Sequence, residues 1–81
     1  MMDSVNIKTL IADGLSCEML QVEGDGQHFE ALIVSTHFAG KNRVQRQQMV
    51  NAVLRPWFDS GELHALSMKT LTPEEWNAPR G

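Results

Sequence analysis

Apolar residues near the N-terminus recur at the spacing of a helix. The pattern begins after Asp3 and Ser4, two candidate N-cap residues, and stops at Gly14, a residue that favours helix termination. A first helix is therefore predicted over this segment. Its apolar positions are Val5, Ile7, Leu10 and Ile11.

Two strand-like segments follow, joined by a glycine-rich turn. Residues 16–23 carry apolar and polar side chains on both parities, so the pattern leaves open which face of this strand is buried. Residues 29–35 contain enough apolar and β-branched side chains to form a buried strand. Because Gly24, Asp25 and Gly26 form a short turn between the two segments, they are predicted to pair as an antiparallel hairpin.

The second half of the chain predicts two further helices and a third strand. Residues 38–41 are a predicted loop, and helical periodicity starts at Asn42. Pro56 is predicted to end this helix and to start a short one that closes at Gly61, because proline lacks a backbone donor. Strict alternation over residues 64–69 then predicts a strand. The apolar stripe of the longer helix is Val50, Val53 and Leu54.

The last predicted element is a short helix with a capping signature. Thr72 is the candidate N-cap, Pro73 stands at the first helical position and Glu75 at the third. The element order is then α-β-β-α-α-β-α, which an α+β sandwich satisfies, with a three-stranded sheet and the helices on one face. Residues 1–81 are predicted to form one domain with mobile tails at residues 1–4 and 77–81.

Composition excludes several classes of protein. A chain of 81 residues and 9.1 kDa supports one small core. One cysteine and the absence of a Cys-x-x-Cys pair exclude an internal disulfide framework and a zinc ribbon. The longest apolar run, residues 31–34, is far too short for a membrane helix, and no signal-peptide pattern opens the chain. A cytoplasmic protein without membrane contact is expected.

Charge is distributed unevenly along the chain. The net charge is -3, but residues 1–40 hold one base against six acids, whereas residues 41–81 hold six bases against four acids. Residues 41–55 contain no acid. One face of the protein is therefore predicted to be basic, and its cations are Lys41, Arg43, Arg46 and Arg55.

The sequence does not indicate an enzyme. Cys17 lies inside a predicted strand, and neither a Gly-x-Ser-x-Gly nor a His-Glu-x-x-His spacing occurs. Cys17 is therefore interpreted as a packing residue. Glu74 and Glu75 are interpreted as favourable charges at a helix N-terminus rather than as a catalytic pair.

Histidines are the candidate metal ligands. His28, His37 and His64 could bind a borderline metal, and two of the three stand at the ends of predicted strands. Without cysteines or clustered carboxylates they do not complete a closed zinc site, although another protein could complete a partial one. For any one of these histidines taken alone, spacing favours an ordinary exposed or hydrogen-bonded surface histidine.

The residues before the longer helix invite comparison with nucleic-acid-binding loops. Gly40, Lys41, Asn42 and Arg43 stand where a Gly-x-x-Gly turn would clamp phosphates, but Arg43 replaces the second glycine. The whole chain is acidic, which weakens non-specific binding to nucleic acid. A solvated basic face or a protein-docking surface is the preferred interpretation of these bases, with weak nucleic-acid binding as the alternative.

Several segments taken together resemble the BolA family. They are residues 34–41, 44–50, 64–69 and 71–76, so the resemblance spans nearly the whole chain. The turn at residues 26–29 and the run from Arg46 to Gln48 are most similar to the short bacterial IbaG branch of that family. Many other members carry Arg-His-Arg where this chain has Arg46, Gln47 and Gln48, so a role for that central histidine does not carry over.

The resemblance implies a type II KH-like fold and a cofactor shared with a partner. BolA-like proteins pair with monothiol glutaredoxins around a [2Fe-2S] cluster, whose sulfur ligands come from the glutaredoxin cysteine and glutathione. The BolA-like subunit supplies a histidine from its last strand, here His64, and a second candidate ligand from the loop between the first two strands, here His28. His37 falls at a position that varies in the family.

Two hypotheses follow from the sequence. The first is an adaptor in iron-sulfur cluster trafficking or in iron and stress regulation, monomeric alone and heterodimeric with a glutaredoxin. The basic residues would then form a docking face. The second is a nucleic-acid-binding regulator that uses Lys41, Arg43 and Arg46 as phosphate contacts.

Overall fold

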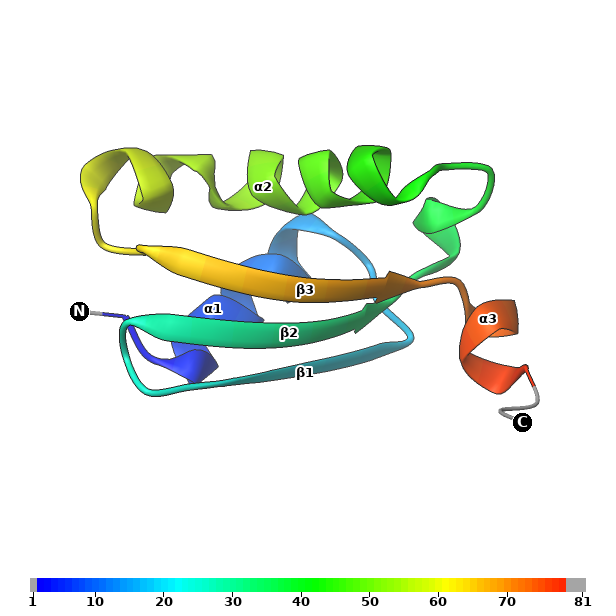
Figure 1. Ribbon diagram of the computed structural model, residues 1–81, viewed down its shortest axis with the longest axis horizontal. Helices are drawn as coiled ribbons and strands as arrows, with labels where there is room; N and C mark the ends of the chain where they lie inside the picture. Colours follow the sequence, from blue (N-terminus) through cyan, green and yellow to red (C-terminus); the bar gives the residue numbers. More distant parts are fainter. Residues whose placement is uncertain (1, 79–81) are drawn as a thin grey trace.

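A computed structural model describes residues 2–78 and shows a three-stranded sheet with two long helices against it (Figure 1). None of the helices in this part of the chain combines the length and apolar character needed to cross a membrane. In chain order the elements are α1 (Ser4–Gly14), β1 (Met19–Gly24), β2 (His28–Val34), the short 3-10 helix η1 (Thr36–Phe38), α2 (Arg43–Ser60), β3 (Ala65–Leu71) and α3 (Pro73–Asn77).

β2 is the central strand of the sheet. The strand order is β1-β2-β3, with β1 antiparallel to β2 and β3 parallel to it. The predicted hairpin is therefore confirmed, and α2 is the crossover that a parallel partner strand requires. His28, the first residue of β2, pairs with Ala65, the first residue of β3.

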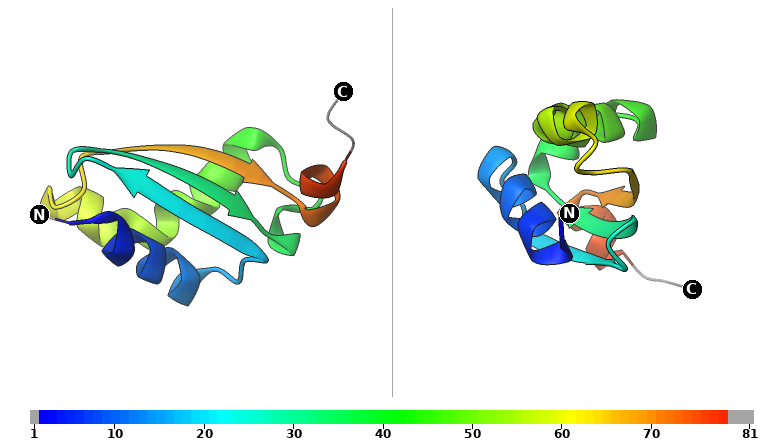
Figure 2. Two further views of the ribbon diagram at one scale, coloured as in Figure 1. Left: turned by 90° about the horizontal axis from the view of Figure 1, so that it is seen from below. Right: turned by 90° about the vertical axis from the view of Figure 1, so that its left-hand side faces the viewer.

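Both long helices cover the same face of the sheet (Figure 2). The other face carries polar side chains in alternation with the core positions, because successive residues of a strand point to opposite faces. α3 lies beyond the C-terminal end of β3 rather than over the sheet (Figure 1). The predicted α+β sandwich is confirmed, with its helical layer made by α1 and α2.

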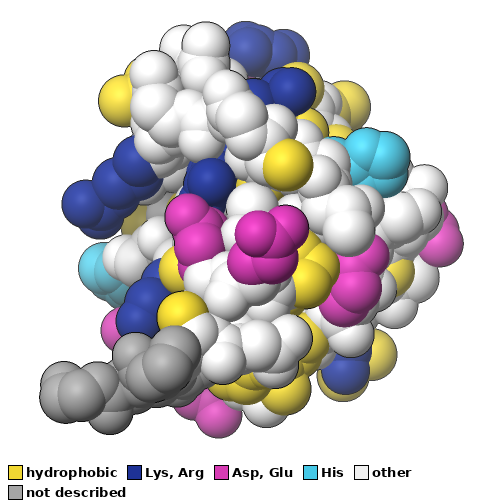
Figure 3. All heavy atoms as spheres, turned by 90° about the vertical axis from the view of Figure 1, so that its right-hand side faces the viewer, with side chains coloured by type: hydrophobic (Ala, Val, Ile, Leu, Met, Phe, Trp, Pro, Cys, Tyr) yellow, Lys and Arg dark blue, Asp and Glu magenta, His cyan; other side chains and the backbone are white. Residues whose placement is uncertain are grey.

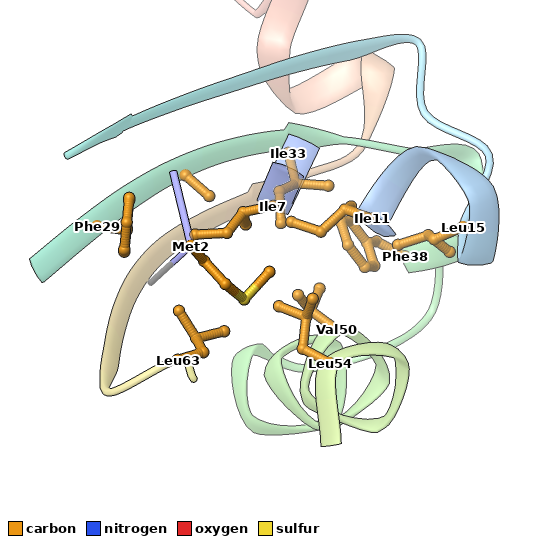
Figure 4. Close-up of a cluster of buried hydrophobic side chains, with 11 residues drawn as sticks. Met2, Ile7, Ile11, Leu15, Phe29, Ile33, Phe38, Val50, Leu54 and Leu63 are labelled. Atoms are coloured by element: carbon orange, nitrogen blue, oxygen red, sulfur yellow. The ribbon is translucent and has the colours of Figure 1, made fainter. Parts of the chain in front are cut away.

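The core lies between β2 and the two helices (Figure 4). Phe29 and Ile33 of β2 are at most 1% exposed, and they meet apolar side chains from both helices. The sequence prediction was correct for the buried helix positions, but Val5 is 69% exposed. Those buried positions are Ile7 and Ile11 of α1 and Val50 and Leu54 of α2.

The prediction that Pro56 separates two helices was wrong. α2 runs unbroken through Pro56 and ends at Gly61, whose φ of 82° is the left-handed conformation that glycine favours at a helix end. Proline removes the bond to the carbonyl of Ala52, but both residues lie on the exposed side, where water can replace it. Burial of Val50 and Leu54 holds the helix on the core.

The boundaries of three other segments differ from their predictions. Residues 2–4 are not a mobile tail, because Met2 is 5% exposed in the core and Asp3 caps α1 through the backbone N–H of Asn6. Residues 16–18 connect α1 to a strand that starts only at Met19. Phe38 ends a 3-10 helix instead of opening a loop. Asn77, the first residue of the predicted C-terminal tail, is the last residue of α3. Residues 79–81, like residue 1, lie outside the described residues.

Arg46 of α2 forms hydrogen bonds with the loop before its own helix and with residues 24 and 29 positions further along the chain. Its Nε donates to the carbonyls of Phe38 at 3.1 Å and Lys41 at 2.9 Å, which closes the loop before α2. Its Nη1 donates to the carbonyl of Thr70 at 3.2 Å, next to the end of β3. The guanidinium also stands 5.9 Å from the centre of the Phe38 ring.

The same guanidinium holds α3. Nη1 of Arg46 lies 2.7 Å from one carboxylate oxygen of Glu75, and Nη2 donates to the other at 3.4 Å. Glu75 also completes the predicted capping box with Thr72. Arg46 therefore joins α2, β3 and α3, and the exposed fraction of its side chain is only 12%.

Gly24 marks a close approach between the ends of β1 and β2. A Cβ atom at this position would lie 2.5 Å from the carbonyl oxygen of His28 and would overlap the ring of the buried Phe29. Neither neighbour can yield easily, because one is backbone and the other is core. Glycine at this position lets the hairpin turn of residues 25–27 close.

Replacing Arg46 by glutamine should destabilise the protein by about 2–3 kcal/mol, because three backbone carbonyls and Glu75 lose a charged donor. Urea unfolding followed by circular dichroism measures the change. Arg43→Gln, an exposed neighbour on α2, is the matched control and should shift stability by about 0.5 kcal/mol or less. Equal effects of the two variants would contradict the role given to Arg46.

The ion pair between Arg46 and Glu75 should also make the free energy of unfolding depend on pH. The hydrogen bond from Arg46, followed by that from the Thr72 backbone, lowers the pKa of Glu75 from its ordinary value. The stabilisation that ionised Glu75 provides is therefore complete above the ordinary pKa of a glutamate and disappears as the pH falls through the lowered pKa of Glu75. The stability difference between the parent and Glu75→Gln should stay constant near neutral pH and shrink in acid. Glu74→Gln serves as the control from the same helix turn.

Gly24→Ala should destabilise the protein by about 1–3 kcal/mol, because the added methyl group overpacks against the His28 carbonyl and Phe29. Thermal unfolding measures the loss. Gln27→Ala, an exposed change two residues beyond the turn's first position, should leave stability nearly unchanged. A Gly24→Ala protein as stable as the parent would contradict the close approach.

Candidate functional site

The structure brings both candidate metal ligands to one end of the sheet. His28 opens β2, and His64 immediately precedes β3, whose first residue Ala65 pairs with His28. Both histidines are exposed. The parallel pairing of β2 with β3 is therefore what brings two residues 36 positions apart to neighbouring strand starts.

His64 stands in an open hollow of about 320 Å³. Three segments form it: the β1–β2 turn, the C-terminal end of α2 and the residues that lead into β3. Gly26 and Gly61 take positive φ values of 101° and 82°, which allows the chain to reverse at both places. His28 is not among the lining residues, which are Gly26, Gln27, Ser60, Gly61, Glu62 and His64.

The two histidines differ in their surroundings. Among the described residues, no hydrogen bond or ion pair involves the His64 imidazole, so its ring nitrogens are free to bind a ligand. His28 faces the carboxylate of Asp25, which accepts hydrogen bonds from the backbone N–H groups of His28 at 2.9 Å and Gln27 at 3.0 Å. These bonds, with a smaller contribution from the charge of His28, lower the pKa of Asp25.

Residues 2–78 bring together no group of three or more His, Cys, Asp or Glu side chains that could hold a metal ion. A metal bound at His64 would therefore take most of its ligands from another molecule. This agrees with the chemistry of a single neutral imidazole, which can fill one position of a site that thiolates complete.

The remaining candidate residues lie away from this hollow. His37 is in η1, which follows the opposite end of β2 from His28. Cys17 is half-buried, and its thiol donates to the carbonyl of Leu15 at 3.1 Å. Burial, followed by the charge of Glu18, raises the pKa of the Cys17 thiol, which disfavours the thiolate.

The basic residues gather at the other end of α2. Lys41 and Arg43 are exposed around the start of this helix. On the face shown in Figure 3, basic side chains lie along the upper rim and acidic side chains cross the middle. Asn42 caps the helix through Gln45, and Gly40 has a φ of 75°. Arg46 is engaged within the chain, so the exposed cations near this loop are Lys41 and Arg43.

The His64 hollow and the basic loop are thus separated by the length of α2. The helix has 18 residues, which corresponds to about 27 Å at 1.5 Å per residue. Only Arg55 among the predicted basic residues lies towards the His64 end. Sequence patterns did not identify Gln27, Ser60 or Glu62 as neighbours of His64, and their only local signals are the glycines beside them.

Comparison with known proteins gives a consistent relationship. The family model described as BolA-like protein matches residues 7–75. The Escherichia coli acid stress protein IbaG is 35% identical over 79 residues, which cover 98% of this chain and 94% of IbaG. The Arabidopsis thaliana protein BOLA2 is 41% identical over 64 residues, which cover 76% of this chain and 67% of the plant protein.

Solved structures show the same fold. A BolA homologue from Coxiella burnetii superposes with a TM-score of 0.84 at 37% identity, covering 96% of this chain and all of that one. A Bol-like protein from Babesia bovis gives a TM-score of 0.81 at 34% identity, covering 94% and 91% of the two chains. With a family match over most of its length, relatives above 30% identity and the same fold, the chain belongs to the BolA family.

Proposed function

We propose that this protein is an adaptor that binds a monothiol glutaredoxin and contributes the His64 imidazole to a shared [2Fe-2S] cluster. Glutathione and the glutaredoxin cysteine would supply the sulfur ligands. His28 is the candidate for a second ligand from this chain. The protein would act in the cytoplasm, in cluster trafficking or in iron and stress regulation, and not as an enzyme.

The observation that carries the proposal is the exposed and unengaged imidazole of His64 in its hollow. Its neighbours are two glycines and small or polar side chains, so a partner's ligands can approach without displacing core residues. Membership of the BolA family supports the same function. The Escherichia coli relative IbaG is named an acid stress protein, which supports a role in stress.

The chemistry of the ligand suits transfer or sensing. Imidazole in place of thiolate raises the reduction potential of an iron-sulfur centre. His64 must be neutral to bind metal, so protons compete with the metal for the same nitrogen. Solvent reaches His64 directly, which lets that proton exchange without opening the fold.

The location of the hollow decides which basic residues would meet a glutaredoxin. A partner seated at His64 contacts the C-terminal end of α2 and the β1–β2 turn. Arg55 lies towards this end, whereas Lys41 and Arg43 lie at the other. The proposed docking face is therefore centred on residues 26–27 and 60–64, with Lys41 and Arg43 outside its centre. The alternative of nucleic-acid binding is less well supported, because the Arg46 guanidinium is occupied within the chain.

His64→Ala should lower the yield of the cluster-loaded heterodimer and change its visible circular dichroism, because one iron loses its nitrogen ligand. The measurement is anaerobic co-expression with a monothiol glutaredoxin, followed by absorption and circular dichroism of the purified complex. His37→Ala is the matched control, since His37 is remote from the hollow. His28→Ala tests the second ligand separately.

An unchanged spectrum and unchanged cluster retention in His64→Ala would contradict the proposal. Far-ultraviolet circular dichroism of the variant alone checks that it folds. Because His64 is exposed and makes no hydrogen bond among the described residues, its loss should change stability by about 0.5 kcal/mol or less.

A further inference from the structure

The end of the molecule that carries His64 has three hollows that adjoin one another. The His64 hollow shares Glu62 with a hollow of about 300 Å³ between α1 and α2. It shares Gly26 with a hollow of about 360 Å³ between the start of α1 and the β1–β2 turn, and Met2 lines both of these neighbours. The β1–β2 turn, the end of α2 and the start of β3 lie at this same end of the molecule (Figure 1). A partner seated at His64 therefore meets one uneven surface rather than an isolated pocket.

The surface made by these three hollows is acidic. Asp3, Asp25 and Glu62 line it and are exposed, whereas no lysine or arginine is among its lining residues. Within residues 2–78, no ion pair neutralises any of these three carboxylates. The surroundings of His64 therefore carry an unbalanced negative charge.

The cations of the two long helices lie outside these hollows. Lys8 of α1 lines none of the three. Arg55 of α2 lines a separate hollow together with Asp59, so an opposite charge accompanies it. Lys41 and Arg43 lie around the other end of α2. The protein is therefore acidic at the His64 end of α2 and basic at the opposite end, an arrangement that orients a charged partner as it approaches.

Each of the three carboxylates is held by a hydrogen bond within the chain. The Ser60 hydroxyl donates to Oε1 of Glu62 at 3.1 Å. Oδ1 of Asp25 accepts from two backbone N–H groups of its own turn, and Oδ1 of Asp3 accepts from one in the first turn of α1. In the described part of the chain, no hydrogen bond reaches the second oxygen of any of the three. A cation can therefore pair with a carboxylate that is already ordered, which lowers the entropy lost on binding.

We propose that the partner that docks at His64 presents lysine or arginine side chains to Glu62, Asp25 and Asp3, so that these carboxylates select a basic partner surface. The inference rests on the proposed function, because the occupant is the glutaredoxin that supplies the sulfur ligands. Glu62 is the main determinant, since it alone of the three lines the His64 hollow itself. The basic surface at the other end of α2 repels the same partner face, which fixes the orientation of docking.

The test is an anaerobic titration of a cluster-loaded monothiol glutaredoxin with the full-length protein, followed by visible circular dichroism. Glu62→Lys should weaken the complex by about fivefold, since it removes an attraction and adds a repulsion. Glu62→Gln, which keeps an oxygen to accept the hydrogen bond from Ser60, should weaken it by about twofold. Raising the ionic strength from about 0.05 M to about 0.3 M should weaken the parent complex more than the Glu62→Lys complex, because salt screens the attraction.

Asp13→Lys is the matched control. It makes the same change of charge at an exposed site of α1, ten residues and about 15 Å along the helix from Asp3. The affinity should stay within about twofold of the parent value, because that separation exceeds the screening length. A glutaredoxin whose basic residue facing Glu62 is changed to glutamate should recover binding to Glu62→Lys, which a folding defect would not allow. Far-ultraviolet circular dichroism checks the fold of each variant.

Three results would overturn the inference. Equal affinities of the parent and Glu62→Lys, with a spectrum that still depends on His64, would overturn it and leave the proposed function standing. A larger loss of affinity from Arg43→Glu than from Glu62→Lys would assign docking to the basic end of α2. If the parent protein forms no complex with the glutaredoxin, the proposed function fails and this inference fails with it.

Discussion

The structure depends on the burial of one face of β2. Phe29 and Ile33 point to the same face of the sheet, and α1 and α2 both pack against that face and bury them. β2 pairs with a strand on each side, one antiparallel and one parallel. With both long helices committed to this face, the opposite face and the outer edge of β3 stay open.

Arg46 shows how a charged residue can be part of the framework. Each of its donors meets a carbonyl or the carboxylate of Glu75, which offsets the cost of holding a guanidinium at 12% exposure. The residue joins the loop before α2, the end of β3 and α3.

The geometry of α2 separates two surfaces with different chemistry. At its C-terminal end, Gly61 turns the chain so that His64 stands beside the β1–β2 turn, in a small hollow with an unengaged imidazole. At its N-terminal end, Lys41 and Arg43 form an exposed basic surface. A helix of 18 residues, about 27 Å long, keeps the two surfaces apart.

Local sequence patterns by themselves determined α1, the start of α2, the hairpin and the cap of α3. Ile7, Ile11, Val50 and Leu54 are buried as their spacing predicts, and Thr72 and Glu75 form the expected capping box. These features depend on residues within a few positions of one another, so local sequence is sufficient to predict them. The family resemblance predicts His64 and His28 as ligands, and the structure places both at the same end of the sheet.

Only the tertiary structure decided the continuity of α2, the role of Arg46 and the composition of the His64 hollow. A local rule breaks the helix at Pro56, but packing of residues on the opposite side keeps it intact. Arg46 belongs by sequence to a basic stretch, and two of its partners lie 24 and 29 residues away. Such contacts depend on the parallel pairing of β2 with β3, and no periodicity along the chain records which distant strands will lie side by side.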